Sequence, residues 1–374
     1  MKAIARSLLT VIAGIGSVSP ILAAAQPKSG AVFVMTNAAD RNEIVTYERT
    51  PDGRLYDGDR YDTGGRGSGG VTDPLESQGS LTLSQDRSLL FAVNAGSGTV
   101  SVFRVHQAFL SLVDKAPSGG SEPVAVTQWR NLVYVLNAGG SGSVVAFRLD
   151  DNGRLHQIRG ATAFLTANVT GGASISISPD GQFLVVTERL ANNIDTFRIK
   201  ANGALAPIVV NASAGPGTFS AIFAPEGNLI VSETGPSGAV NGSAISSYSV
   251  LANGTLSPIS QSLPTLGAAN CWNAVTPDGK WVYVSNAGSA TISGFAINGD
   301  GTLMPIGGTV VGTNPEGSTN LDIAVTADGK YLYSLNSGGG TVGIFAIQQD
   351  GTLLNLGDAG SLPKSSGFNG IAAL

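Results

Sequence analysis

The sequence is poor in the residues that carry most protein chemistry. It has 374 residues, of which one is cysteine and two are histidine, and only 13% are charged. Because Cys271 has no second cysteine to pair with, no disulfide can form within the chain, and we interpret it as a small buried residue. His106 and His156 lie where outer strands are expected, without metal-ligand spacing, so we expect neither a histidine-based triad nor a metal site.

Cofactor motifs are equally scarce. Residues 65–70 (GRGSGG) match the glycine pattern of dinucleotide-binding loops, but no helix is expected after them to hold a pyrophosphate. Asp57, Asp59 and Asp62 precede this run without the spacing of a calcium-binding loop. We therefore expect no cofactor.

Basic residues are outnumbered once the N-terminus is set aside. Residues 1–25 resemble a secretory signal, with Lys2 and Arg6, an apolar stretch from Leu8 to Leu22, and three alanines before the expected cut after Ala25. The remainder has 19 basic and 26 acidic residues, a net charge of −7, which argues against a nucleic-acid partner. No later segment is apolar for long enough to span a membrane. We expect a secreted or periplasmic protein.

What the sequence does contain is a unit that recurs about every fifty residues. Its clearest copies are SPDGQFLVVTERLANNIDTFRI (178–199), TPDGKWVYVSNAGSATISGFAI (276–297) and TADGKYLYSLNSGGGTVGIFAI (326–347). Each copy reads as an inner strand with a tight turn, a second strand, a third strand, and an Asn-Gly or Asp-Gly hairpin. Seven residues are expected to end the second strands: Asn37, Asn94, Asn137, Glu188, Thr234, Asn286 and Asn336.

Seven such units predict the fold class. A four-stranded unit cannot bury its own faces and must stack against its copies, and this period is typical of propellers. The first unit lacks an inner strand, whereas residues 367–374 (GFNGIAAL) have the pattern of one. We predict an all-β, seven-bladed β-propeller over residues 26–374, with four-stranded antiparallel blades. Its C-terminal strand completes the N-terminal blade, and the protein is expected to be monomeric.

The repeat also resembles a known family. The segments VYVSN (282–286) and LYSLN (332–336), each after Asp-Gly-Lys, are similar to the YVTN repeat of lactonase-type seven-bladed propellers, the group of bacterial 6-phosphogluconolactonase and fungal carboxymuconate cyclase. The resemblance implies lactone chemistry, with His, Arg and Glu at the mouth of the ring. At the matching positions this chain has Gly171 to Ala173, Gly217 to Phe219 and Ser285 to Ala287, and the acidic position corresponds loosely to Glu188 or Glu233.

Candidate site residues are those where one unit departs from the others. Glu188 and Glu233 are the candidate acid or base, Arg189 is a cation for a carboxylate, and Trp272 offers a stacking surface. Polar residues at inner-strand starts complete the candidate substrate-binding set: Asn270, Asn320 and Asp322. The structural alternative is a local Glu188–Arg189 ion pair and a packed Trp272.

Two functions of different class follow. The first is a secreted lactonase-like enzyme that opens or closes a small carboxylated lactone, or acts on a related sugar acid, by carboxylate chemistry. The second is a non-catalytic propeller that binds a protein or glycan partner on its ring face.

Overall fold

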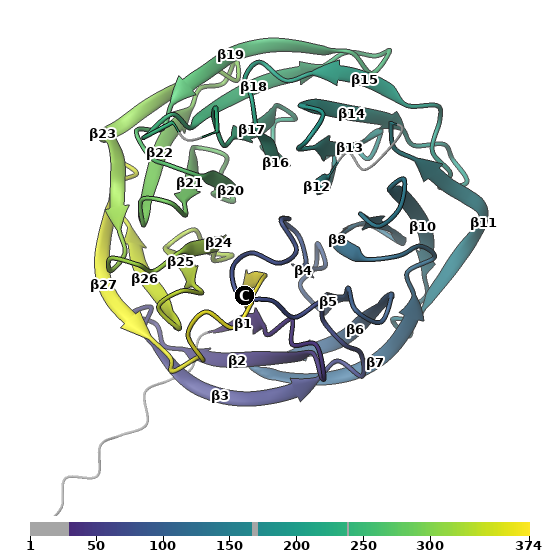
Figure 1. The fold of residues 1–374 in the computed structure, drawn as a ribbon, viewed down its shortest axis with the longest axis horizontal. Coiled ribbons are helices and arrows are strands. Elements are labelled where there is room, and N and C mark those ends of the chain that lie inside the picture. Colours follow the sequence, from purple (N-terminus) through teal and green to yellow (C-terminus); the bar gives the residue numbers. More distant parts are fainter. Residues whose placement is uncertain (1–29, 167–170, 238) are drawn as a thin grey trace, which may run out of the picture.

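Seven four-stranded antiparallel sheets stand side by side around a central axis, as the repeat predicts (Figure 1). The computed structural model describes residues 30–166, 171–237 and 239–374, and every regular element within them is a strand. The expected signal peptide, residues 1–25, lies outside the described residues. We number the sheets as blades 1 to 7 in chain order.

In each blade the strands follow one another from the axis to the rim (Figure 1). Blade 1 contains β28 (Ile371–Ala373), β1 (Gly30–Met35), β2 (Glu43–Arg49) and β3 (Leu55–Asp62). Blade 2 contains β4 (Leu81–Leu83), β5 (Leu89–Asn94), β6 (Thr99–His106) and β7 (Phe109–Pro117). Blade 3 contains β8 (Pro123–Trp129), β9 (Leu132–Asn137), β10 (Ser143–Leu149) and β11 (Leu155–Phe164). Blade 4 contains β12 (Gly172–Ile177), β13 (Phe183–Glu188), β14 (Asn193–Arg198) and β15 (Val209–Ala212).

The remaining three blades repeat this order. Blade 5 contains β16 (Thr218–Phe223), β17 (Leu229–Glu233), β18 (Ala244–Val250) and β19 (Leu256–Pro264). Blade 6 contains β20 (Asn270–Val275), β21 (Trp281–Asn286), β22 (Thr291–Ile297) and β23 (Leu303–Thr313). Blade 7 contains β24 (Asn320–Val325), β25 (Tyr331–Asn336), β26 (Thr341–Ile347) and β27 (Leu353–Ala359).

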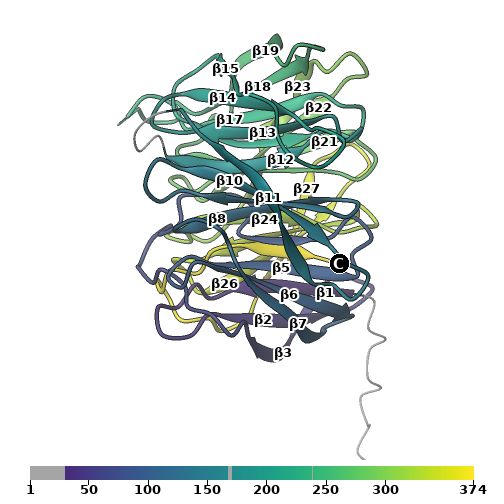
Figure 2. The same ribbon diagram turned by 90° about the vertical axis from the view of Figure 1, so that its right-hand side faces the viewer.

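The ring closes as predicted, through the C-terminal strand. β28 pairs antiparallel with β1, and Ile371 lies opposite Val34 while Ala373 lies opposite Val32. Figure 2 shows the ring from the side, with blade 1 at one edge and blades 4 and 5 at the other. The pairing gives β1 a neighbour on both sides, which removes the free sheet edge that an open array would expose.

Burial across each blade explains why these segments form strands. The second strands, such as β9 and β13, are buried along their whole length because neighbouring blades cover both faces. Tyrosines of these strands seal the blades to one another: Tyr134, Tyr283 and Tyr333 each donate a hydrogen bond to a glycine carbonyl in the outer hairpin of the next blade, at 2.8–2.9 Å. The last of these joins blade 7 to blade 1.

The ends of the second strands define one face of the ring, which we call the mouth. At this face the chain crosses from the outer strand of one blade to the inner strand of the next. The strand ends are fully buried and are Asn in blades 2, 3, 6 and 7 and Glu in blades 4 and 5. The expectation that Asn37 ends the second strand of blade 1 is wrong, because β1 ends at Met35 and the buried Asn37 follows two residues later. The expectation that Thr234 ends the second strand of blade 5 is wrong, because β17 ends at Glu233, which pairs with Ala244.

Candidate functional site

Glu188 and Glu233, the candidate acid or base residues, anchor crossover loops. The Glu188 carboxylate accepts a hydrogen bond from the Thr166 amide at 2.8 Å and a second from the Thr166 hydroxyl. The Glu233 carboxylate accepts from the Gly215 amide at 3.0 Å and from three serine hydroxyls: Ser213, Ser246 and Ser262. These loops join the preceding blade to the blade that contains the glutamate, so the geometry gives both carboxylates a structural role.

Asn270 and Asn320 occupy equivalent places and hold adjacent blades together. The Asn270 amide donates to the Ala244 carbonyl at 2.7 Å, across the boundary between blades 5 and 6. The Asn320 amide donates to the Thr291 carbonyl at 3.0 Å, across the boundary between blades 6 and 7. Ala244 and Thr291 both begin third strands, so the two contacts are repeats of one interaction. Neither asparagine lines the cavity described below.

Asp322 lies near the axis, where the ring closes. Its carboxylate accepts hydrogen bonds from the amides of Ile371, at 3.2 Å, and Ile323. Burial raises the pKa of Asp322 to about 7, against these two hydrogen bonds, which lower it. Asp322 thus links β24 to the closing strand, and the nearby charge of Asp73 raises its pKa further.

A segment that no repeat pattern predicts enters the centre of the ring. Residues 71–80, which we call the plug, lie in the crossover from β3 to β4 and reach toward the axis (Figure 1). Ser77 donates to the Val124 carbonyl in blade 3, and the Gln78 amide donates to the Ala173 carbonyl in blade 4, both at 2.9 Å. The Gln78 side chain also bonds both backbone groups of Asn273 in blade 6. The plug therefore connects inner strands around the axis.

The glycine-rich run before the plug allows the crossover to lie close to the strand ends. A Cβ added to Gly65 would lie 2.4 Å from the Asn94 side chain, and one added to Gly67 would lie 2.2 Å from the Asn37 backbone. Only glycine permits such an approach. The run follows outer strand β3 and no helix follows it, so the glycines serve the crossover rather than a phosphate.

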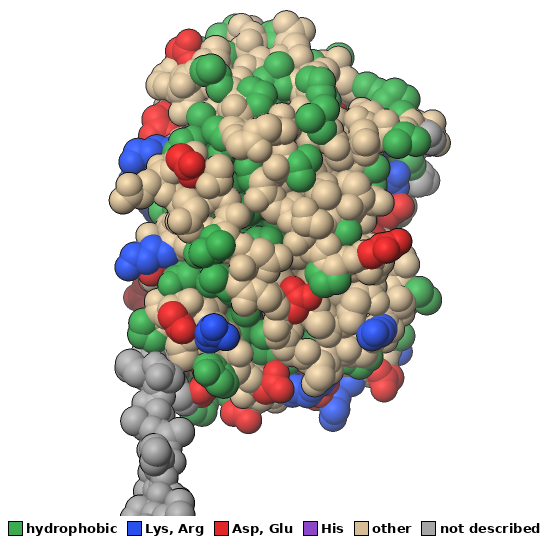
Figure 3. Space-filling view, turned by 90° about the vertical axis from the view of Figure 1, so that its left-hand side faces the viewer, with side chains coloured by type: hydrophobic (Ala, Val, Ile, Leu, Met, Phe, Trp, Pro, Cys, Tyr) green, Lys and Arg blue, Asp and Glu red, His purple; other side chains and the backbone are tan. Residues whose placement is uncertain are grey.

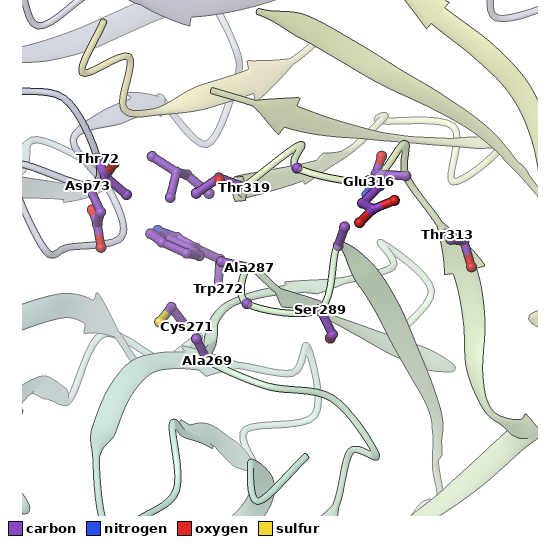
Figure 4. A pocket seen from close by; sticks show the side chains of 15 residues that line it. Thr72, Asp73, Ala269, Cys271, Trp272, Ala287, Ser289, Thr313, Glu316 and Thr319 are labelled. Atoms are coloured by element: carbon purple, nitrogen blue, oxygen red, sulfur yellow. The ribbon is translucent and has the colours of Figure 1, made fainter. Parts of the chain in front are cut away.

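A cavity of about 570 Å³ opens at the mouth between the plug and blades 6 and 7. Figure 4 shows Asp73 and Thr72 of the plug at one end, near Trp272 and Cys271, and Glu316 and Thr313 at the other. Most of its remaining wall comes from loop residues: Ala269, Ala287, Gly288, Ser289, Ala290, Asn314, Gly317 and Thr319. The cavity thus extends from near the axis toward the rim. We call it the mouth cavity.

Asp73 is the cavity residue whose charge is most altered by its surroundings. Burial, and then the negative charge of Glu76, raise the pKa of Asp73 to about 7. A hydrogen bond from the Asn369 side chain, at 2.9 Å, and the positive charge of Arg189 oppose this rise. The carboxyl group therefore gains and loses its proton near neutral pH, which suits a general acid or base.

Trp272 and Cys271 form wall rather than open surface. Trp272 is only 1% exposed, because its indole N–H donates to the Ser77 carbonyl at 2.9 Å and its ring packs edge-on against Phe219 at 5.3 Å. Burial raises the pKa of the Cys271 thiol well above its usual value, so the thiol stays neutral. Trp272 thus lines the mouth cavity but offers a ligand little of its ring face.

Arg189 has a different partner from the expected ones. Its guanidinium forms an ion pair with Glu76 of the plug rather than with Glu188, and it does not line the mouth cavity. Glu233 lines a separate, smaller cavity of about 210 Å³ beside Asn241. Of the residues proposed from sequence, the structure brings only Trp272 to the wall of the mouth cavity.

Asp73 and Asn314 are the functional candidates that sequence reasoning missed. Asn314 is buried in the cavity wall, and among the described residues its side-chain nitrogen has no hydrogen-bond partner. It can therefore donate to a ligand oxygen. Asp73 lies in a segment without counterpart in the other units, so comparison of the repeats could not identify it.

The described residues meet neither the requirements of a metal site nor those of a membrane-spanning helix. In residues 30–166, 171–237 and 239–374, no group of three or more His, Cys, Asp or Glu residues could hold a metal ion. Those ranges also contain no apolar helix of membrane-spanning length. His156 lies on the opposite face of the ring, where it bonds Asp150 at 3.0 Å.

Seven four-stranded blades around an axis, with a ligand-sized cavity at one mouth, define this protein as a seven-bladed β-propeller. Residues 140–271 match the family described as lactonase, 7-bladed beta-propeller. The chain is 25% identical over 259 residues to 6-phosphogluconolactonase of Cronobacter sakazakii. This match covers 63% of this chain and 75% of that protein. By these matches the chain is similar to lactonase-type seven-bladed β-propellers over part of its length.

Solved structures agree in fold. A candidate 6-phosphogluconolactonase from Bacteroides uniformis has a TM-score of 0.69 and 19% identity, covering 92% of this chain and 99% of that one. The periplasmic gluconolactonase of Pseudomonas aeruginosa has the same TM-score and coverage, with 17% identity. At these identities the similarity concerns the arrangement of the blades.

Proposed function

We propose that this protein hydrolyses a lactone in the mouth cavity, with Asp73 as the general base. The observation that supports this most directly is a carboxyl group in the wall of a cavity of about 570 Å³. Cavities of about 300 to 1,000 Å³ are typical of small-molecule sites. The similarity to a 6-phosphogluconolactonase suggests the reaction class.

The reaction needs a proton acceptor and later a proton donor. The ionised Asp73 takes a proton from water as the water oxygen bonds to the lactone carbonyl carbon, and the carbonyl electron pair moves onto its oxygen. When that pair returns, the ring C–O bond breaks. The protonated Asp73 then gives its proton to the departing ring oxygen, and the product is the open hydroxy acid. Asn314 can donate a hydrogen bond to a substrate oxygen meanwhile.

The direct test is lactone turnover by Asp73→Asn, measured with glucono-1,5-lactone above its spontaneous hydrolysis. We expect kcat/KM to fall about 100-fold or more, the usual contribution of a general base. Asp151→Asn is the matched control, because Asp151 is exposed in an outer hairpin on the opposite face. Full turnover by Asp73→Asn would refute the proposal.

The same assay decides the earlier assignment to Glu188 and Glu233. Since their carboxylates are held by loop groups, Glu188→Gln and Glu233→Gln should lower stability more than the turnover of the folded enzyme. Loss of turnover in either folded variant, with Asp73→Asn active, would restore the sequence-based assignment.

The pH profile gives a second test of Asp73. Since the base must be ionised, kcat/KM should rise with pH through a midpoint near 7. Glu76→Gln removes a like charge and releases Arg189, and both effects lower the pKa of Asp73. The midpoint should therefore move to lower pH in Glu76→Gln. An unchanged midpoint would mean that another group is titrating.

We also propose that residues 1–25 direct export and are removed. The relevant support is the composition of that segment. Fractionation of cells that express the full chain, with N-terminal sequencing of the product, tests this, and a cytoplasmic product that retains residues 1–25 would contradict it.

A further inference from the structure

The charges around the mouth cavity indicate which lactones fit there. Two carboxyl groups line it, Asp73 near the axis and Glu316 toward the rim (Figure 4). Among the described residues that line it, none is lysine or arginine. Glu316 is exposed in the loop between β23 and β24, at the cavity entrance.

Nearby cations do not compensate for these carboxylates. Arg189 is the basic residue whose charge reaches Asp73 and Cys271, but Glu76 neutralises it in a direct ion pair. Arg66 lies in the crossover from blade 1 to blade 2, and Lys364 in the segment that leads to the closing strand, and neither lines the cavity. A ligand in this cavity therefore meets a net negative environment.

The uncharged part of the wall suits hydroxyl groups. Hydroxyl side chains recur along it, at Thr72, Ser289, Thr313 and Thr319, together with the unpaired amide nitrogen of Asn314. Hydroxyl groups can both donate and accept, so they match the hydroxyls of a sugar-derived ring. An anionic group would instead need arginine or lysine, which bind carboxylate and phosphate in most sites.

We propose that the mouth cavity selects an uncharged, polyhydroxylated lactone and discriminates against lactones that carry a phosphate or carboxylate. This rests on the proposed function, and it replaces the carboxylated ring expected from sequence, because Arg189 is paired with Glu76. It also separates this chain from relatives named for a phosphorylated substrate.

The test compares glucono-1,5-lactone with its 6-phosphate on the same enzyme. We expect kcat/KM to be at least 100-fold higher for the uncharged lactone, and the ratio to narrow as salt is added, since salt screens the repulsion. Glu316→Lys should lower this ratio at least tenfold. Asp151→Lys makes the same change of net charge on the opposite face and should leave the ratio unchanged. A ratio is used because it cancels differences in the folded fraction.

The outcomes for the two proposals are separable. A preference for the phosphorylated lactone, or a ratio unaffected by Glu316→Lys, would overturn the selectivity while leaving lactone hydrolysis intact. If neither lactone is hydrolysed, calorimetric binding of gluconolactam and its 6-phosphate decides. Tighter binding of the uncharged lactam supports the selectivity without hydrolysis, and tighter binding of the phosphate, or no binding, refutes it.

Discussion

Two buried carboxyl groups, Glu188 and Asp195, face each other in blade 4. Asp195 is the third residue of β14 and lies opposite Val186 of β13. The side chains of Glu188 and Asp195 are both fully buried. Burial first, and then the charge of Glu188, raise the pKa of Asp195 to about 8. Among the described residues neither oxygen of the Asp195 carboxyl has a hydrogen-bond partner, so nothing offsets the cost of burying its charge.

Other blades have an uncharged residue at the third-strand position that Asp195 occupies in blade 4. The corresponding residue is serine in blades 2, 5 and 6, and its hydroxyl bonds the residue that ends the second strand: Ser101, Ser246 and Ser293. Serine accepts or donates as needed and carries no charge. Blade 4 alone among these four therefore links its stability to pH through this position.

We predict that Asp195→Ser makes stability less dependent on pH. Between pH 3.8, the ordinary pKa, and about 8, folded Asp195 keeps a proton that the unfolded chain has lost. The free energy of unfolding therefore falls as pH rises, by up to about 1.4 kcal/mol per pH unit from this group. Asp195→Ser should be more stable than the wild type at pH 8, with the gain shrinking toward pH 4.

Urea unfolding at pH 5 and pH 8 measures this effect. Asp151→Ser, at an exposed carboxylate, is the control and should track the wild type at both values. If the difference in unfolding free energy between Asp195→Ser and the wild type is the same at pH 5 as at pH 8, the pKa of Asp195 is not raised in the folded protein.

The site residues proposed from sequence show what a repeat comparison can detect. Glu188 and Glu233 stand out because most units have asparagine there, yet their carboxylates do what asparagine side chains do elsewhere, which is to hold the crossover loop. A residue that differs from its counterparts in the other units either keeps their structural role or has gained a functional one. A single sequence shows the same departure from the repeat in both cases. Burial and hydrogen-bond partners are needed to separate them.

The plug is the element that gives the mouth cavity its inner wall. Its residues contact blades 3, 4, 5 and 6, through Val124, Ala173, Ser220 and Asn273. Asp73 takes its position from this same segment, with Asn369 of the closing segment as its hydrogen-bond donor. Catalysis and ring geometry should thus respond together to changes in the plug.

We predict that Gln78→Ala loosens the plug. The Gln78 side chain donates to the Asn273 carbonyl at 2.7 Å and accepts from the Asn273 amide and the Ser220 hydroxyl. Removing it leaves these groups without their partner, which costs about 1 to 3 kcal/mol of unfolding free energy. Hydrogen exchange at residues 71–80 should rise, and KM for the lactone should rise with it.

Gln349→Ala is the matched control for that experiment, because Gln349 is exposed next to an outer hairpin. It should change neither exchange nor KM. Unchanged exchange in Gln78→Ala would mean that the backbone contacts of the plug suffice to hold it.

At the scale of elements, the strands and hairpins were predictable but the plug was not. Alternating apolar residues and Asp-Gly turns are local signals, and glycines such as Gly181 and Gly279 have the positive φ that those turns need. The plug has no periodic pattern and is held by contacts with four distant blades, which depend on the closed ring. Local patterns do not encode such contacts.

At the scale of the whole molecule, the repeat was sufficient to predict the ring and its closure. Stacking of like units leaves few alternatives once seven copies and a displaced inner strand are counted. On the side that Figure 3 shows, lysine and arginine side chains lie apart among acidic ones, without a broad basic area. This agrees with the excess of acidic over basic residues in the sequence.

The last prediction concerns the closing strand. Ile371 is buried between β1 and blade 7, so Ile371→Ala should cost about 2 to 5 kcal/mol, whereas Leu354→Ala on the exposed rim should cost under about 0.5 kcal/mol. Removal of residues 369–374 goes further, because it uncovers the edge of β1, whose free backbone groups can pair with a second chain. We therefore expect the shortened protein to unfold at lower urea concentration and to form oligomers, seen by light scattering after size exclusion. A shortened protein that stays monomeric and as stable as the full chain would show that the blades hold the ring together without β28.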